Sequence, residues 1–387
     1  AWRFFKLSLI IYNLLLLQLI MKISVLQENL AKALLFVNRA VSVRPNIPVL
    51  ANVLLEADKG KIKLSATNLE VGIATWIGAE VAESGKLTVS AKLLTEFVNS
   101  LKKGKLDMYE ADQMFEVNFV DNRAQFFIIP AEDFPKVPEA EGEILMEINA
   151  LELADAIAKT SFSAGVDESR PVLTGVLMLA KEKELTLVGV DGFRLSRKVL
   201  QMDKVIKQDE FKEIVPAKSL IEVEKLIREV ADEKMTVSIY YLGAKNQLLF
   251  KIGDLEFSTR LIEGDFPDYE KIIPTENIVK FTVAREELVN VIKIASIFAR
   301  NVIGNKTRFR IEPDQKKLSL SASVIDIGKN ESKIELEESM GEEFETGYNI
   351  KFLNDMVNAI KGKKIEFQSK GPQAPGVFLD PDDKQYI

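Results

Sequence analysis

One eight-residue block occurs three times in this chain, and this repeat limits the folds that the sequence can adopt. The copies share a strand-like run of apolar and small residues, and they are Ile62–Leu69, Leu185–Gly192 and Leu318–Ile325. They lie about 130 residues apart, which is the size of a domain and much longer than the period of a solenoid. The 387 residues are therefore expected to form three similar domains in tandem.

Each copy stands at the same place in a longer series of predicted elements. A short strand and an amphipathic helix come first, and two strands joined by a polar turn follow. The predicted hairpins pair 53–57 with 61–66, 175–180 with 184–190, and 308–312 with 317–322. Each unit then has a second helix, and these helices are Ala91–Leu101, Ala217–Val230 and Lys351–Ile360. The predicted fold class is α+β, with three tandem repeats of two helices on antiparallel sheet.

Proline and polar residues mark the ends of the units. Asp133-Phe134-Pro135 and Asp265-Phe266-Pro267 precede two predicted linkers, Pro138–Glu143 and Pro274–Asn277. The predicted domains are residues 21–140, 145–273 and 278–387, the last of which stops inside an apparent strand. Strand edges at the borders of such units favour pairing with the next domain, and a closed ring would leave none of them free.

Residues 1–20 differ from the rest of the chain because they are almost continuously apolar, with Arg3 and Lys6 as their only charges. This length and composition would suit a membrane span or an uncleaved signal. Met21 opens the first unit, so we interpret the segment as upstream translation or a gene-boundary artefact outside the fold. We accordingly expect no membrane partner. The alternative function is a membrane-anchored binding module that uses this segment.

The chain contains no Cys and no His, which excludes several classes of site. Disulfides, thiolate nucleophiles, Cys/His zinc sites and Ser-His-Asp triads cannot form. A carboxylate-metal nuclease using Asp191 or Asp265 is the remaining enzymatic hypothesis. Asp191 corresponds to Asn68 and Ile325 in the other copies, so the repeat builds no acid cluster, and Asp beside Gly is typical of turns. We predict a non-enzymatic protein without cofactors or metals, and the absence of Cys fits a cytoplasmic location.

Positive charge gathers on the second helices although the net charge is −7. Each of these helices begins with a lysine within its first residues, and the three are Lys92, Lys218 and Lys351. A solvated helix face is the ordinary explanation for any one helix. Three equivalent basic helices in an acidic chain indicate instead a basic surface that contacts nucleic-acid phosphates without reading sequence.

From Met21 to its end, the chain resembles the bacterial DNA polymerase sliding clamp, the beta subunit of the replicative polymerase III holoenzyme. The resemblance rests on Arg44–Pro48, Asp191–Leu195 and Gly264–Tyr269. It implies three similar domains per chain and two chains closed head to tail into a ring, with helices lining the hole and strands forming the outer wall. The implied function is that of a processivity factor that encircles duplex DNA. Its implied partners are the polymerase alpha subunit, the clamp loader and other proteins with clamp-binding motifs.

The resemblance also implies three groups of site residues. The DNA contacts would be Arg44 and Lys218, with Lys92 and Lys351 at equivalent repeat positions. The groove for partner peptides would use Leu173, Gly192, Phe193, Arg194, Leu195, Pro267, Lys271 and Ile272, with Arg194 as its polar rim. The ring contact would pack Phe134 against Ile297 and Phe298. Phe193 stands where some members have His. The family's last apolar strand, with a Met-Pro or Val-Pro pair, does not follow Ile387, so we expect a groove open on one side.

Overall fold

The computed structural model describes residues 21–387 except 43, 205, 207–208 and 325–327. The apolar extension 1–20 and Ile325 of the third repeat copy therefore lie outside the described residues. The chain divides into two compact units. Of the described residues, the first unit contains those up to Leu151 together with Lys225–Leu261, and the second unit contains those of Glu152–Glu224 and Ile262–Ile387.

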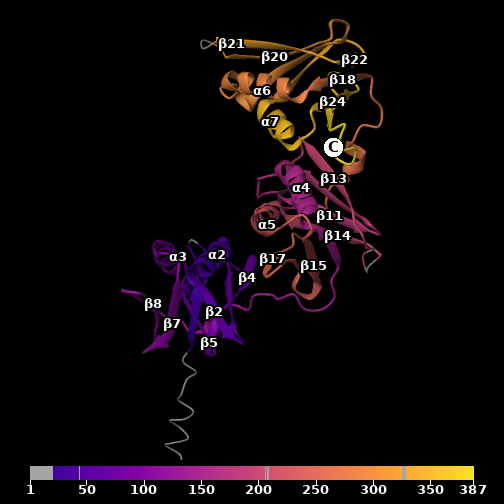
Figure 1. Cartoon of the computed structure of the whole chain (residues 1–387). Coiled ribbons are helices and arrows are strands. Elements are labelled where there is room, and N and C mark those ends of the chain that lie inside the picture. The colour runs from indigo at the N-terminus through magenta and orange to yellow at the C-terminus, as the bar shows by residue number, and fades with distance from the viewer. Residues whose placement is uncertain (1–20, 43, 205, 207–208, 325–327) are drawn as a thin grey trace, which may run out of the picture. The chain divides into compact units, whose positions relative to one another are not determined.

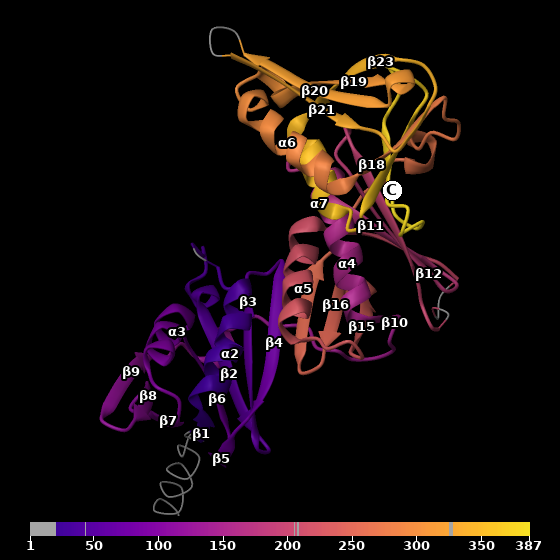
Figure 2. The same ribbon diagram turned by 45° about the horizontal axis from the view of Figure 1, so that its top comes forward.

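The first unit places helices α2 (Gln27–Val37) and α3 (Ala91–Ser100) side by side, with α2 packed on strands β3 and β4 (Figures 1 and 2). Its described residues form two antiparallel sheets, with strand orders β5-β1-β7-β8-β9 and β10-β15-β16-β17-β4-β3-β2-β6. The strands are β1 Lys22–Leu26, β2 Asn52–Asp58, β3 Lys61–Thr67, β4 Val71–Gly78, β5 Glu80–Glu83, β6 Gly85–Ser90, β7 Lys105–Ala111, β8 Met114–Phe119, β9 Asn122–Phe127, β10 Met146–Asn149, β15 Thr236–Leu242, β16 Gln247–Ile252 and β17 Leu255–Arg260.

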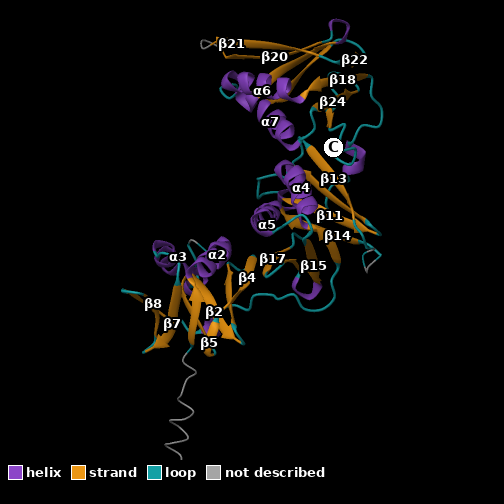
Figure 3. Ribbon diagram, in the orientation of Figure 1, coloured by secondary structure: helices purple, strands orange, loops and turns teal. Residues whose placement is uncertain are grey.

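The second unit also consists of antiparallel sheets with helices packed on them (Figure 3). Its described strands form three sheets, ordered β13-β12-β11-β14, β22-β18-β24-β25 and β21-β20-β19-β23. Helices α6 (Arg285–Ala299) and α7 (Ile350–Ala359) pack on each other, and α6 lies against β20 and β21. The strands are β11 Gly175–Lys181, β12 Glu184–Val190, β13 Leu195–Gln201, β14 Phe211–Pro216, β18 Val279–Ala284, β19 Lys306–Glu312, β20 Lys317–Val324, β21 Gly328–Glu335, β22 Glu338–Met340, β23 Phe344–Asn349, β24 Lys364–Ser369 and β25 Val377–Leu379.

The three repeat copies form equivalent strands, β3, β12 and β20, and each pairs with the strand before it as predicted. The first hairpin turns through Lys59 (φ 46°) and Gly60 (φ 79°). Two consecutive residues with positive φ make the tight turn whose twist matches paired strands, and glycine adopts this conformation without strain. The hairpin pattern of the sequence is therefore realised in the fold.

The predicted second helices agree with the structure to within one residue at each end: they are α3, α5 (Ala217–Val230) and α7. The first helices of the repeats are α2, α4 (Ala150–Thr160) and α6. Side-chain caps explain two of the starts. The Ser90 hydroxyl accepts from the Leu93 N–H at the start of α3, and Asn349 accepts from the Lys351 N–H at the start of α7. Such caps satisfy amide groups that the helix itself leaves unpaired.

The long sheet of the first unit joins strands from two of the repeats. Strand β17 pairs with β4 over five residues, from Leu255 opposite Thr75 to Thr259 opposite Val71. The linker 138–143 has no helix or strand. Lys63 forms an ion pair with Glu139, and the Ala140 N–H donates to Glu256 at 3.1 Å. The border between these repeats is thus closed by main-chain hydrogen bonds, and the linker is bound to the sheet.

Candidate functional site

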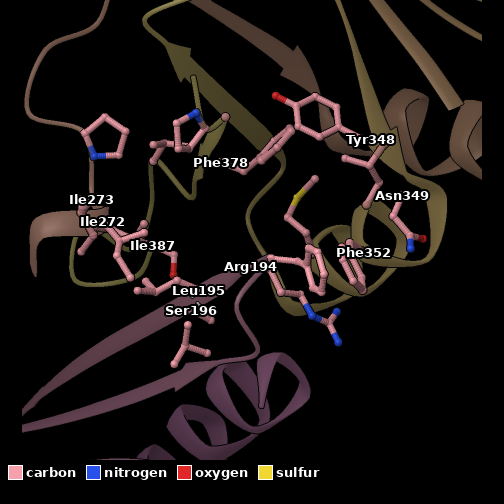
Figure 4. A pocket seen from close by; sticks show the side chains of 18 of the residues that line it. Arg194, Leu195, Ser196, Ile272, Ile273, Tyr348, Asn349, Phe352, Phe378 and Ile387 are labelled. Atoms are coloured by element: carbon pink, nitrogen blue, oxygen red, sulfur yellow. Dashed lines mark hydrogen bonds between the residues drawn. The ribbon is translucent and has the colours of Figure 1, made fainter. Parts of the chain in front are cut away.

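A pocket of about 380 Å³ lies within the second unit. In Figure 4, Ile272, Ile273 and Ile387 occupy one side, Tyr348, Asn349 and Phe352 the other, and Leu195 the base. Its lining comes from the loop before β13, the 3-10 turn Tyr269–Ile272, helix α7, strand β25 and the last two residues of the chain. A pocket of this size with a mostly apolar lining suits a few side chains of a bound peptide.

The aromatic core of the second unit supports one wall of this pocket. Phe281 stacks on Phe367 with ring centroids 4.8 Å apart, and Phe309 packs against Phe367 in a tilted arrangement at 5.6 Å. All three rings are fully buried. Tyr348 and Phe378 pack against Phe309 and also line the pocket. Burial raises the pKa of Tyr348 far above its ordinary value, so this hydroxyl stays neutral. This wall is therefore uncharged and is backed by packed aromatic rings.

Arg194 stands at the edge of the pocket and is bound on several sides. Its Nε donates to Asp191 at 3.0 Å, its Nη1 to Asp355 at 2.6 Å, and its Nη2 to the Phe162 carbonyl at 2.6 Å. The guanidinium also lies 4.3 Å from the centre of the Phe352 ring. These contacts connect the loop before β13 with helix α7.

The last two residues, Tyr386 and Ile387, line the pocket and pair with strand β13. The Arg197 N–H donates to the Ile387 carbonyl at 2.9 Å, and the Ile387 N–H donates to the Arg197 carbonyl at 3.0 Å. Asp383 holds this segment through Lys159 at 2.7 Å and Lys198 at 2.6 Å. Burial alone would raise the pKa of Asp383, but the hydrogen bonds from the two lysines outweigh it and lower the pKa.

Asp191 has a structural role that argues against the nuclease hypothesis. Its Oδ1 accepts from the Phe193 and Arg194 N–H groups at 2.8 and 2.9 Å, and Gly192 takes a positive φ of 91°. This is the side-chain turn that Asp-Gly predicts. Asp265 is exposed, and the described residues hold no group of three or more acidic side chains placed to bind a metal ion.

The four predicted DNA-contacting residues are all exposed. Lys92, Lys218 and Lys351 are each the second residue of α3, α5 or α7, and Arg44 lies in a bend after α2. None of these three helices has an acidic residue in its first turn, whereas α2, α4 and α6 all do. A cation there opposes the helix dipole and disfavours the helix by about 0.3–1 kcal/mol. Helix stability therefore does not explain the repeated lysine.

Comparison with known proteins accounts for nearly the whole described chain. Models of the N-terminal, central and C-terminal domains of the DNA polymerase III beta subunit match residues 21–138, 147–268 and 270–386 in that order. This chain belongs to the bacterial sliding-clamp family. The expected α+β clamp fold of three repeated domains is thereby confirmed.

Individual clamps are similar to this chain along almost their full length. The beta sliding clamp of Synechococcus elongatus is 29% identical, over 93% of this chain and 96% of the relative. The crystal structure of the DNA polymerase III subunit beta from Pseudomonas aeruginosa has a TM-score of 0.86 at 27% identity, covering 95% and 98% of the two chains. The sliding clamp from Bacillus subtilis has a TM-score of 0.89 at 23% identity, covering 95% and 97%, and supports the fold.

Five of the eight residues that the clamp resemblance assigned to the partner groove line the pocket: Gly192, Phe193, Arg194, Leu195 and Ile272. Leu173, Pro267 and Lys271 lie outside its lining. Leu173 is half-buried in the 3-10 turn Pro171–Thr174, and its carbonyl accepts from the Gly165 N–H at 2.7 Å. Lys271 is exposed and pairs with Asp268 at 2.6 Å. Whether these three contact a partner peptide stays a prediction.

Sequence reasoning missed the contribution of helix α7 to the pocket. Three residues of this helix line it: Phe352, Leu353 and Met356. Leu353 and Val357 are buried on the same helix. The apolar face of α7 is therefore broader than packing against the core requires. This broad apolar face is visible in the sequence and could have indicated a binding surface.

The residues predicted to form the clamp's ring contact differ in exposure. Phe134 is buried in a small cluster with Val49 and Val137. Ile297 is 58% exposed on α6, whereas Phe298 is half-buried against the core beneath it. Of the three, Ile297 is the side chain free to meet another surface.

The membrane alternative depended on residues 1–20, which are not described, and none of the helices in the described chain is both long and apolar enough to span a bilayer.

Proposed function

We propose that this chain works as a sliding clamp that closes with a second copy into a ring around duplex DNA and tethers the replicative polymerase. Members of the family are processivity subunits rather than catalysts, and this chain is accordingly non-enzymatic. A tether raises the local concentration of the polymerase at its template, so processivity needs no tight contact with DNA. The observation that carries the proposal is the succession of three beta-subunit domains along one chain.

We propose further that Lys92, Lys218, Lys351 and Arg44 contact the phosphate backbone. Support comes from the lysine repeated at the second position of three equivalent helices, where the helix dipole disfavours it. Changing the three lysines to Glu should weaken DNA binding and flatten its dependence on salt, because each lost phosphate contact reduces the counterions released.

A matched control uses lysines from the hairpin turns of the same repeats. Lys59, Lys183 and Lys316 are exposed, and the triple change to Glu alters the net charge by the same amount. Fluorescence titration of a labelled duplex at several salt concentrations compares the two variants. Equal salt slopes for both would reject the helix lysines as the DNA contact.

Ring closure is tested by topology. A clamp loaded on closed circular DNA should remain bound through gel filtration at moderate salt, and cutting the circle should release it. Retention on linear DNA equal to that on circles would indicate ordinary groove binding and would contradict the ring.

The dimer contact is proposed to use Ile297 against the region of Phe134 in the second copy. Ile297→Asp leaves the core untouched because the side chain is already exposed, and it should shift sedimentation equilibrium toward monomer. Val166→Asp, at a side chain that is 91% exposed, is the control. An unchanged dimer fraction in Ile297→Asp would place the contact elsewhere.

The pocket beside Arg194 is proposed to bind the apolar peptide segments of the polymerase alpha subunit, the clamp loader and related partners. Ile272→Asp should abolish binding of a labelled polymerase-tail peptide, because it introduces a charge into an apolar lining. Ile278→Asp changes a more exposed isoleucine outside the lining, at 59% exposure against 45% for Ile272, and this variant should bind as the unmodified chain does. Leu173→Asp then tests whether the groove extends beyond the observed pocket.

A further inference from the structure

Five charged side chains of the second unit form one ion-pair network. Asp155 pairs with Lys361 and, at 2.9 Å, with Lys159. Asp383 pairs with Lys159 at 2.7 Å and with Lys198 at 2.6 Å. Positive and negative groups therefore alternate, and Lys159 lies between the two carboxylates. Of the described residues that line the pocket, none belongs to this network.

The network joins four segments that also line the pocket. Helix α4 carries Asp155 and Lys159, β13 carries Lys198, Lys361 follows α7, and Asp383 lies near the end of the chain. The 3-10 turn after α4, the first residues of β13, one face of α7 and the last two residues of the chain all belong to the lining. The relative positions of these four segments define the shape of the pocket, and the network holds them together.

Lys159 connects the network directly to one wall of the pocket. Its Nζ lies 5.3 Å from the centre of the Tyr386 ring, which lines the pocket. The Lys159 carbonyl accepts from the Ser196 hydroxyl at 2.6 Å, and the same hydroxyl lies 3.2 Å from the Ile387 carbonyl. A change at Lys159 would therefore disturb this wall, although Lys159 itself lies outside the lining.

Lys159 keeps its charge although its side chain is only 6% exposed. Burial alone would lower the pKa of Lys159, but the hydrogen bonds to Asp383 and Asp155 outweigh burial and raise the pKa. Salt screens such nearly buried pairs much less than exposed ones. The network can therefore hold its segments in place over a wide range of ionic strength.

The other two repeats show that the first helix does not need this charge. Lys159 is the tenth residue of α4, and the tenth residues of α2 and α6 are Phe36 and Ile294. Both of these are apolar, and Phe36 is buried. The lysine is therefore particular to the central repeat, whose first helix leads into the lining of the pocket.

We propose that Lys159 is a positioning residue for the pocket: through Asp155 and Asp383 it fixes α7 and the last residues of the chain at the spacing that a bound peptide requires. Peptide affinity then depends on a side chain that the peptide does not touch. By linkage, a bound peptide in turn strengthens the pairing of the last residues with β13. This inference rests on the proposed function of the pocket as a peptide site.

The first test is Lys159→Met with a labelled peptide of six residues that is rich in Leu and Phe and carries no charge. An uncharged peptide excludes direct attraction to the lysine. The variant should bind it about tenfold more weakly, within the range of coupling that packed networks transmit. Lys361→Met, at the 60% exposed end of the network, should weaken binding only about twofold. Fluorescence anisotropy measures both, well below the unfolding temperature, where circular dichroism confirms that each variant is folded.

Lys63 in the first unit provides a matched control. It pairs with Glu56 and Glu139, its side chain is 13% exposed, and its Nζ lies 5.4 Å from the centre of the Trp76 ring. Lys63→Met removes a similarly placed cation outside the network and the lining, so it should lose comparable stability and keep the native peptide affinity. Equal peptide affinities in Lys63→Met and Lys159→Met would overturn the positioning role.

Hydrogen exchange gives a second readout, which a lysine with a merely structural role would not alter. The Arg197 and Val199 amides donate to the carbonyls of Ile387 and Gln385 at 2.9 and 3.0 Å. Saturating peptide should slow exchange at both amides in the unmodified chain, and by less in Lys159→Met. If the peptide binds the unmodified chain without slowing either amide, the inference fails and the peptide site stands. If the unmodified chain binds no peptide, the peptide site fails, and the inference fails with it.

Discussion

The two borders between the family domains are closed by different kinds of bond. At the first border, main-chain hydrogen bonds between β4 and β17 join the N-terminal and central domains, and we call this the sheet seam. At the second border, the central and C-terminal domains meet through Arg194–Asp355 and through Asp383 with Lys159 and Lys198, which we call the ion-pair seam. Main-chain bonds form with almost any side chain, whereas ion pairs need particular residues.

This difference explains where the pocket lies. The ion-pair seam places defined side chains at an interface, so the same residues that close the border can also shape a binding site. The sheet seam offers continuous backbone pairing and few side-chain choices. We therefore expect changes at the sheet seam to act on folding, and changes at the ion-pair seam to act on both folding and partner selection.

The largest effect is expected from Ser258→Pro, which places proline in the middle of β17. Proline removes a hydrogen bond of the sheet and should lower the free energy of unfolding by about 3 kcal/mol or more. Ser258→Ala removes only the hydrogen bond from the Ser258 hydroxyl to the Gly72 carbonyl, and it should lower the free energy of unfolding by about 1 kcal/mol. Urea denaturation followed by circular dichroism measures both. Comparable losses for the two variants would show that the seam does not depend on its backbone.

A loss of about 3 kcal/mol is expected for Asp383→Asn, because it leaves Lys159 and Lys198 without their shared carboxylate. Both lysine side chains are nearly buried, at 6% and 11% exposure. The exposed neighbour Asp382 provides the control, and Asp382→Asn should change stability by less than about 0.5 kcal/mol. Amide hydrogen exchange should quicken at Arg197, whose N–H is bound by Ile387. Protection of Arg197 unchanged from the native chain would contradict the anchoring role of Asp383.

The two borders should also respond differently to acid. The pKa values of Asp383 and Asp155 are lowered in the folded chain: burial opposes the shift, and hydrogen bonds from lysines outweigh it. Their stabilisation is present above the unfolded pKa near 4 and is lost as the pH falls through the lowered folded pKa. The protection of the Arg197 amide, measured against an unfolded amide at the same pH, should therefore fall below about pH 4. The Phe257 amide in β17 should stay protected. Simultaneous loss of protection at both amides would mean that the two borders unfold as one.

The smallest effect is expected from Lys361→Met. Lys361 pairs with Asp155, but its side chain is 60% exposed, and exposed ion pairs contribute about 0–1 kcal/mol. Lys159→Met at the same cluster removes a buried cation, and its loss of folding stability should be several times larger than that of Lys361→Met. If thermal denaturation shows equal losses of stability for the two variants, burial does not determine how much each ion pair of this seam contributes.

The fold was largely accessible from sequence because its signals are local. Helix α5 was predicted with its observed ends, Ala217 and Val230, since a regular apolar stripe defines it. The pairing of β4 with β17 was accessible only as a general expectation that free edges meet the next domain. Their residues are far apart in the chain, and no local pattern specifies which strand meets which.

The site was accessible in part. The Asp191–Leu195 segment was found because its residues carry the family resemblance, and four of its five residues line the pocket. Asp355 was not singled out, because an acidic residue on a helix ordinarily faces solvent. Only the distance to Arg194 gives it a role, and that distance depends on how two domains pack.

The sheet seam also sets an order of events during synthesis. A ribosome releases Val71–Gly78 long before Leu255–Arg260, and these two strands are partners in the finished molecule. Until Arg260 has emerged, β4 presents a free edge that can pair with a neighbouring nascent chain. The hazard of aggregation is therefore fixed by the position of a strand in the gene, and a ribosome stalled between these two segments would prolong it, however stable the finished sheet is.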